Sequence, residues 1–222
     1  MPALSGPEPR TTRGFGTDWT GGRGMETKIL LIRHGETLWN REFRKQGQRD
    51  VPLSDLGREQ AAKLAGYLKD ETFSAIYASD LSRAKETAQL VAKPHRLPVT
   101  VFPEFRERNF GEWEGLMDEE VKRKYPDWKE VALNGGKYGV ETVKAMQKRF
   151  SEKCEELARE HFGGQIAIVA HGLCIHMFLH AVTGGEYGPQ REKLKNTSMT
   201  RLIYHQNGRW TVESYNEVPH LQ

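Results

Sequence analysis

The sequence has few cysteines, no long apolar run and little net charge, and each absence excludes a class of protein. Cys154 and Cys174 are its only cysteines among 222 residues, so no disulfide framework beyond one bridge is possible, and their spacing is not that of a metal-binding pair. A helix needs about 20 apolar residues to cross a bilayer. The longest candidate, residues 165–182, is interrupted by three histidines and a glycine, so no membrane span is expected.

The charge balance gives no indication of a polyanionic partner such as a nucleic acid. The formal net charge is +3, from 33 basic and 30 acidic residues that are interspersed along the chain. This pattern predicts a solvated mixed surface rather than a nucleic-acid-binding face. Both cysteines lie in apolar helical stretches, which predicts reduced thiols in the core and therefore a cytoplasmic protein. Oligomeric state cannot be read from these features.

Residues 1–24 differ from the rest of the chain. They contain six glycines and three prolines with almost no aliphatic residues, too little apolar surface to order a segment. The segment also lacks the apolar core of a signal peptide. We therefore expect a disordered tail over residues 1–24 and a single folded domain over residues 25–222.

The remaining sequence alternates between short aliphatic runs and helical patterns. Strands are expected over residues 28–32, 75–78, 99–102, 165–169, 199–204 and 210–213. Helices are expected after Ser54 through Leu68, over about 81–92 and 140–161, and after Gly172 through Leu179, while residues 103–139 read as less regular. This alternation predicts an α/β fold, a three-layer sandwich with a mostly parallel sheet. The last two strands are expected to form an antiparallel edge.

Reactive side chains follow three of these strands. Arg33 and His34 end the first, Arg83 follows the second, and His171 and Gly172 follow the strand over 165–169. Because ligands of open α/β sheets bind at the carboxyl ends of the strands, we expect these residues to meet at one edge of the sheet.

This combination suits phosphoryl transfer. Guanidinium groups match phosphate oxygens with paired, charge-assisted hydrogen bonds, and a neutral imidazole such as that of His34 is a competent nucleophile. A carboxylic acid must protonate the leaving oxygen and then activate water. Glu107 is the candidate, and Glu104 and Glu112 remain open as alternatives.

Five segments resemble motifs of the histidine phosphatase superfamily, also called phosphoglycerate-mutase-like. Residues 33–37 (Arg-His-Gly-Glu-Thr) match its signature, which residues 38–40 continue, and residues 46–54 match the loop before its first long helix. The second arginine motif, the proton-donor motif and the second histidine motif correspond to residues 79–88, 106–115 and 170–172. The resemblance spans residues 28 to about 220.

The resemblance implies a phosphoglycerate-mutase-like fold and a role for each matching residue. It implies that His34 accepts the phosphoryl group, that Arg33 and Arg83 clamp it with His171, and that Glu107 donates the proton. It further implies that the phosphate or the substrate contacts Asn40, Gln46, Gly47 and the backbone N–H of Gly172. No cofactor and no metal are implied, and the expected partner is a small phosphomonoester.

Within this family, the sequence favours hydrolysis over mutase chemistry. In the mutase branch an adjacent arginine pair, well after the proton-donor motif, helps to bind the substrate; residues 125–137 hold no such pair. The expected function is a metal-independent phosphomonoesterase, similar to broad-specificity bacterial phosphatases and α-ribazole phosphatases. Phosphoglycerate-mutase-type transfer and a regulatory or docking protein with weak catalysis remain alternatives. Which phosphomonoester is the substrate cannot be read from the sequence.

Overall fold

A computed structural model describes residues 26–222, so the predicted tail and the domain start at Met25 lie outside the described residues. The strands are β1 (Glu26–Arg33), β2 (Ala75–Ala78), β3 (Val99–Val101), β4 (Gln165–Ala170), β5 (Met199–His205) and β6 (Trp210–Glu217). The helices are α1 (Leu38–Arg41), α2 (Asp55–Leu68), α3 (Ser82–Ala92), α4 (Asp118–Lys124), α5 (Trp128–Asn134), α6 (Val143–Glu160) and α7 (Gly172–Val182). Short 3₁₀ turns occupy Pro103–Phe105, Gly111–Trp113 and Pro219–Leu221.

The strands form one mixed sheet in the order β3-β2-β4-β1-β5-β6. The four strands from β3 to β1 are parallel, and β5 and β6 are antiparallel to their neighbours, which confirms the predicted antiparallel edge. The last strand runs to Glu217, beyond the predicted end at residue 213. A register shift opposite Arg201 interrupts the alternating side-chain pattern, because a bulge adds an unpaired residue to one strand.

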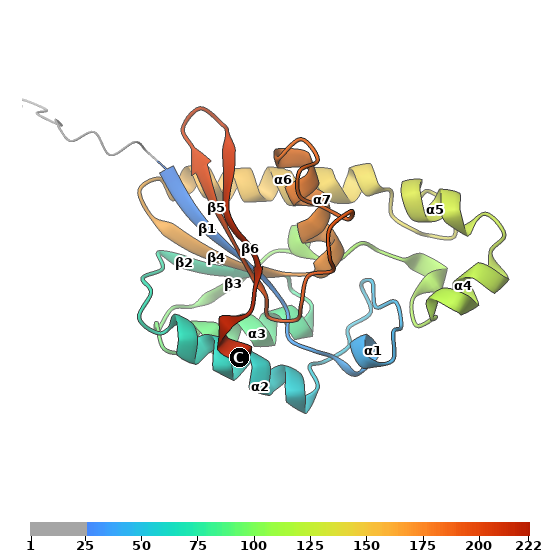
Figure 1. The fold of residues 1–222 in the computed structure, drawn as a ribbon, viewed down its shortest axis with the longest axis horizontal. Helices are drawn as coiled ribbons and strands as arrows, with labels where there is room; N and C mark the ends of the chain where they lie inside the picture. The colour runs from blue at the N-terminus through green and yellow to red at the C-terminus, as the bar shows by residue number, and fades with distance from the viewer. Residues whose placement is uncertain (1–25) are drawn as a thin grey trace, which may run out of the picture.

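Helices cover both faces of the sheet, which confirms the three-layer α/β prediction (Figure 1). One core lies between the sheet and α6 with α7, around Phe150 and Phe178. The other lies between the sheet and α2 with α3, around Leu64 and Val91. Long β-branched and leucine runs fill β1 and β4 because both faces of these central strands are buried.

The segment after β3 is more ordered than the sequence indicates. It contains α4 and α5, which close over a third apolar cluster around Trp113, Tyr125 and Val131. Figure 1 shows these two helices at one end of the molecule, away from the sheet. Helices of seven residues carry only one or two turns of apolar periodicity, too few to predict from the sequence.

Two of the longer helices begin where a hydroxyl side chain caps the first turn. Ser54 accepts a hydrogen bond from the Gly57 backbone N–H (3.0 Å) and begins α2. Thr142 does the same for Ala145 (3.1 Å), so α6 begins at Val143, three residues later than predicted. A capping hydroxyl satisfies one of the N–H groups that the first helical turn leaves unpaired.

Both cysteines are free thiols in the core, as predicted. Burial raises the pKa of each thiol well above its ordinary value, so neither is poised as a nucleophile. None of the helices within residues 26–222 has the length and apolar character to span a bilayer.

Candidate active site

The register of the central strands places the two predicted histidines side by side. Arg33 at the end of β1 pairs with Ala170 at the end of β4, so His34 and His171 are the next residues of adjacent parallel strands. Their ring centroids lie 5.1 Å apart. Both side chains are buried, with exposed fractions of 3% and 0%. The predicted meeting of strand ends is therefore present.

His34 is held as a neutral imidazole with one nitrogen available. Its Nδ1 lies 2.7 Å from the carbonyl oxygen of Gly35; a carbonyl can only accept, so Nδ1 carries the proton and Nε2 keeps its lone pair. Burial, and then the charges of Arg83 and Arg33, lower the pKa of His34 well below its ordinary value. A neutral ring with a fixed tautomer is the nucleophilic form of histidine.

The backbone around His34 is fixed by close contact with α2 and α3. A side chain on Gly35 would lie 2.5 Å from the carbonyl oxygen of Gly57, so only glycine permits this approach. The Gly35 N–H donates to the Thr87 hydroxyl (3.1 Å), which in turn donates to the carbonyl of Arg83 (2.7 Å). The histidine loop and the helix that carries Arg83 therefore move as one unit.

Arg83 is a buried cation, 1% exposed, held by backbone carbonyls rather than by carboxylates. Its Nη1 donates to the carbonyl of Arg49 and its Nη2 to that of Gly47, both at 2.8 Å. Burial lowers its pKa to about 10, although Glu107 and Asp50 act in the opposite direction. Its charge is therefore present at neutral pH, and no carboxylate in the described part of the chain pairs with it directly, as an anion site requires.

Arg33 is a second cation beside His34. Burial lowers its pKa, and the nearby carboxylate of Glu107 partly offsets this. One guanidinium nitrogen donates to the carbonyl of Leu194. Within residues 26–222 the Nε of Arg33 has no hydrogen-bond partner. The two ring nitrogens of His171 have none either. Buried polar atoms without partners are costly unless a ligand satisfies them.

Glu107 is the carboxylate at this site. Its oxygens accept hydrogen bonds from the backbone N–H groups of Leu173 (3.0 Å) and Cys174 (3.1 Å) at the start of α7. Arg149 holds the carbonyl of Glu107 (3.0 Å). The alternatives Glu104 and Glu112 do not line the cleft that Glu107 lines, so the geometry favours Glu107 among the three carboxylates.

The predicted loop residues lie at the same opening. Gly47 has a φ of +53°, and a side chain there would lie 2.1 Å from the Glu114 carboxylate, so this position requires glycine. The Oδ1 of Asn40 accepts from the backbone N–H of Thr37 (3.2 Å) and from Asn196 (3.3 Å), which leaves its amide NH₂ as the donor for a ligand. The Oε1 of buried Gln46 has no partner in the described chain.

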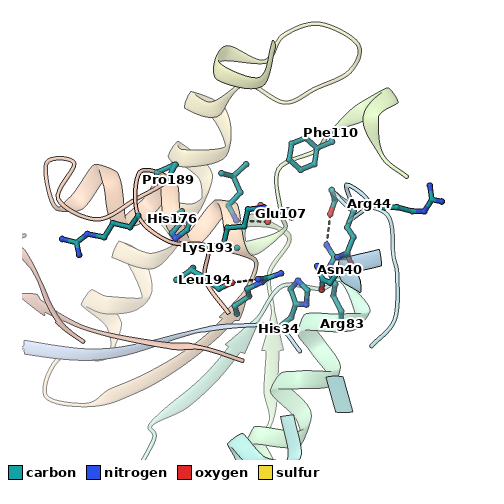
Figure 2. A pocket seen from close by; sticks show the side chains of 16 residues that line it. His34, Asn40, Arg44, Arg83, Glu107, Phe110, His176, Pro189, Lys193 and Leu194 are labelled. Atoms are coloured by element: carbon teal, nitrogen blue, oxygen red, sulfur yellow. Dashed lines mark hydrogen bonds between the residues drawn. The ribbon is translucent and has the colours of Figure 1, made fainter. Parts of the chain in front are cut away.

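These groups surround one cleft of about 350 Å³ (Figure 2). Of the nine predicted site residues, His171 alone does not line it, although its ring is next to that of His34. The cleft has further lining residues that sequence reasoning missed, namely Arg44, Phe110, Leu173, His176, Pro189, Arg191, Lys193 and Leu194. One of them was recoverable, since His176 lies one helical turn after Gly172 and so shares its face of α7. Pro189, Arg191, Lys193 and Leu194 lie in the loop over residues 183–198, which has no periodicity that would have revealed them.

His176 and His180 lie four residues apart on α7, a spacing that could present both rings to a metal ion, but their surroundings differ. His176 contacts the Tyr215 hydroxyl through its Nε2 (2.8 Å), and His180 is exposed. Among the described residues, no group of three or more His, Cys, Asp or Glu side chains is arranged to hold a metal ion.

The whole described chain resembles known phosphatases. It is 32% identical over 195 residues to the uncharacterized phosphatase PhoE of Bacillus subtilis, covering 88% of this chain and 97% of that one. It is 32% identical over 206 residues to a metal-independent phosphoserine phosphatase of Arabidopsis thaliana, covering 88% and 83%. The solved structure of Bacillus stearothermophilus YhfR superposes with a TM-score of 0.82 at 29% identity, covering 88% and 100%. Proteins named probable phosphoglycerate mutase are also among the relatives.

A family model connects these likenesses to the site. The model described as histidine phosphatase superfamily (branch 1) matches residues 29–218, which include every strand-end residue of the cleft. The chain therefore belongs to branch 1 of the histidine phosphatase superfamily.

Proposed function

We propose that this phosphatase hydrolyses small phosphomonoesters through a phosphohistidine on His34, without a metal ion. One observation carries the proposal: a neutral His34 with Nδ1 bound to the Gly35 carbonyl lies within the field of two arginines that form no direct ion pair with a carboxylate of residues 26–222. Nε2 is then the nucleophile, and the two guanidinium groups supply the positive charge that a metal ion would otherwise supply.

In the first step the Nε2 lone pair of His34 attacks phosphorus and the ester P–O bond breaks. Glu107, acting as the general acid, gives a proton to the leaving oxygen. Arg33 and Arg83 bind the equatorial oxygens, and the ring of His171, whose two nitrogens have no partner within residues 26–222, supports the phosphate from beside His34. The buried donors are in place before the substrate arrives, so little reorganisation is needed as charge develops.

In the second step water attacks the phosphohistidine. The Glu107 carboxylate takes a proton from that water, the P–N bond breaks, and inorganic phosphate leaves with His34 again neutral. The backbone N–H of Gly172, at the N-terminus of α7, supports the phosphate because peptide N–H groups and the helix dipole favour an anion there. Asn40, Gln46 and Gly47 complete the rim that contacts phosphate or substrate.

Mutase-type transfer would use the same first step. It is the second candidate because some relatives of this chain are named probable phosphoglycerate mutases. The described geometry favours hydrolysis, because none of residues 125–137, where the mutase branch places its arginine pair, lines the cleft. A purely regulatory or docking role is the weaker alternative, since the nucleophile, the two arginines and the carboxylate are all assembled at one opening.

The test is hydrolysis of p-nitrophenyl phosphate with excess EDTA by the native protein and two variants. His34→Ala removes the nucleophile, and His180→Ala removes an exposed histidine that lines no part of the cleft. We expect turnover in the native protein and in His180→Ala, and loss of it in His34→Ala. Turnover that needs added metal, or that survives in His34→Ala, would overturn the proposal. Turnover of phosphoglycerates into their isomers without phosphate release would favour the mutase.

We further propose that residues 25–222 form a single domain that acts in the cytoplasm. The two buried thiols, free in the core, support a reducing compartment. Limited proteolysis is expected to leave a fully active fragment that begins near residue 25. Division of residues 26–222 into two separately stable fragments would contradict a single domain.

A further inference from the structure

A second chamber of about 330 Å³ adjoins the phosphate cleft. The two share four lining residues, and all four carry hydrogen-bond donors: Arg33, Asn40, Arg44 and Lys193. The rest of the second chamber includes two aromatic and two charged side chains, namely Trp39, Phe43, Lys45 and Asp118. The dividing wall is therefore rich in donors and positive charge.

The charges in this chamber are not equally available. Lys45 pairs with Asp118 (2.7 Å). Arg44 donates to Glu42 (2.7 Å) and to the carbonyl of Gly115 (2.8 Å). In contrast, the ammonium group of Lys193 has no hydrogen-bond or ion-pair partner in residues 26–222. Of the cations that line both chambers, Arg33 and Lys193 therefore form no ion pair within residues 26–222, and Lys193 is the one that the proposed phosphate clamp does not use.

The effect of Lys193 on a neighbouring carboxylate shows that its charge reaches the second chamber. The pKa of Asp118 is lowered, first by the hydrogen bond from Lys45 and further by the charge of Lys193, so the ammonium group lies within electrostatic reach of the second chamber. Figure 2 shows Lys193 across the cleft from Arg44, with Glu107 between them and His34 below. Lys193 is thus a cation of the cleft in addition to the two arginines of the proposed phosphate clamp.

The aromatic residues of the second chamber are arranged for contact with a ligand. Phe43 is 81% exposed, and its φ of +56° is one that side-chain-bearing residues rarely adopt. Strained backbone often occurs at ligand-binding sites, and the exposed ring of Phe43 is not used for packing in the core. With Trp39 in the same chamber, it offers an apolar wall to a carbon chain.

We propose that the leaving group of the substrate carries a second anionic group, a carboxylate or a phosphate, and that Lys193 binds it where the two chambers meet. This inference rests on the proposed phosphomonoesterase function and specifies its substrate class. Arg33 and Arg83 are committed to the reacting phosphate, so Lys193 supplies charge that a neutral leaving group would leave unused. The aromatic chamber accepts the carbon chain between the two anions.

The experiment compares matched substrates in the native protein at fixed ionic strength. The first set is ω-hydroxyalkyl phosphates of increasing chain length, the second has a terminal carboxylate at each length, and the third a terminal phosphate. Chain length measures the reach from the reacting phosphorus to the lysine, and the last two sets distinguish the two kinds of anion. The value compared is kcat/KM for each charged substrate divided by that of its hydroxyl partner.

Two variants test the assignment to Lys193. Lys193→Gln removes the charge and keeps a polar, unbranched side chain that is one atom shorter. Lys195→Gln removes the same charge two residues further along the same loop, from a lysine that lines neither chamber, and so controls for the general field of the protein. We expect a ratio of roughly tenfold or more at a preferred chain length in the native protein and in Lys195→Gln, falling toward unity in Lys193→Gln, as loss of a charge-assisted hydrogen bond predicts.

The outcomes separate this inference from the proposed function. Ratios near unity at every length, with the hydroxyalkyl phosphates hydrolysed, would overturn the second-anion subsite and leave the phosphatase proposal standing. A high ratio that Lys193→Gln retains would overturn the assignment to Lys193. No hydrolysis of any member would overturn the proposed function and this inference with it.

Discussion

Replacing Gly47 by alanine should damage stability and phosphate binding together. Its φ of +53° is in the left-handed region, which costs a side-chain-bearing residue about 1–2 kcal/mol. The new methyl group would lie 2.1 Å from the Oε1 of Glu114. That oxygen accepts from the backbone N–H groups of Gln48 (2.7 Å) and Phe110 (3.2 Å), so the carboxylate must move and weaken both hydrogen bonds.

The magnitude follows from these two effects. A hydrogen bond to a charged group contributes about 1.5–3 kcal/mol, and part of that is recovered when the displaced carboxylate meets water. When the backbone strain is added, the unfolding free energy should fall by about 3–5 kcal/mol. This is a large share of the roughly 5–15 kcal/mol that stabilises a typical domain. The carbonyl of Gly47 also accepts from Arg83 (2.8 Å), so a displaced loop should raise KM for p-nitrophenyl phosphate by roughly tenfold.

Urea unfolding followed by tryptophan fluorescence measures the first effect, and steady-state kinetics at a temperature where the variant is folded measures the second. The control is Gly66→Ala in α2, where a side chain would meet nothing within 4 Å. In a helix interior this change should stabilise by about 0.5–1 kcal/mol. Gly47→Ala with native stability and native KM would refute the reasoning.

Three further predictions concern charge and protonation. Glu107→Gln should lower kcat/KM for alkyl phosphates by roughly 10²–10⁴-fold but much less for p-nitrophenyl phosphate, whose leaving group needs no proton; equal losses for the two substrates would contradict a proton-donor role. Arg83→Lys should lower kcat/KM by roughly a hundredfold, since one ammonium group cannot bind the carbonyls of Gly47 and Arg49 and also fork a phosphate; native kinetics would contradict the clamp. Burial lowers the pKa of His220 to about 4, so the unfolded chain binds more protons between about pH 4 and 6.5 and stability falls as the pH drops through that window. His220→Asn should remove about 1–2 kcal/mol of the pH dependence of the unfolding free energy, a value discounted for the solvent access of the ring. Urea titrations at several pH values measure this, and an unchanged pH dependence would contradict it.

The meeting of the strand-end residues was predictable because it follows from local pattern and topology. Aliphatic runs of five or six residues mark buried strands, and parallel neighbours bring their carboxyl ends to one edge. Arg33 pairs with Ala170 in the sheet, and this register places His34 beside His171. No long-range information beyond the βαβ rule was needed.

Other parts of the site depend on contacts that no local pattern carries. Choosing Glu107 over Glu104 and Glu112 required the position of the α7 N-terminus, which is distant in sequence. Lys193 lies in a loop between α7 and β5 with no periodicity, and its importance comes from the cavities on its two sides. The helices α4 and α5 are stabilised by tertiary packing around Trp113 rather than by their own propensity.

The central claim is the covalent intermediate on His34. In Glu107→Gln, p-nitrophenyl phosphate can still phosphorylate the histidine, but the base that activates water for the second step is missing. Stopped-flow measurement should therefore show a burst of nitrophenolate stoichiometric with enzyme. Peptide mapping after an alkaline quench should place an acid-labile phosphoryl group on His34. A phosphoryl group on any other residue, or a burst that persists when His34→Ala is added to the same variant, would contradict the account.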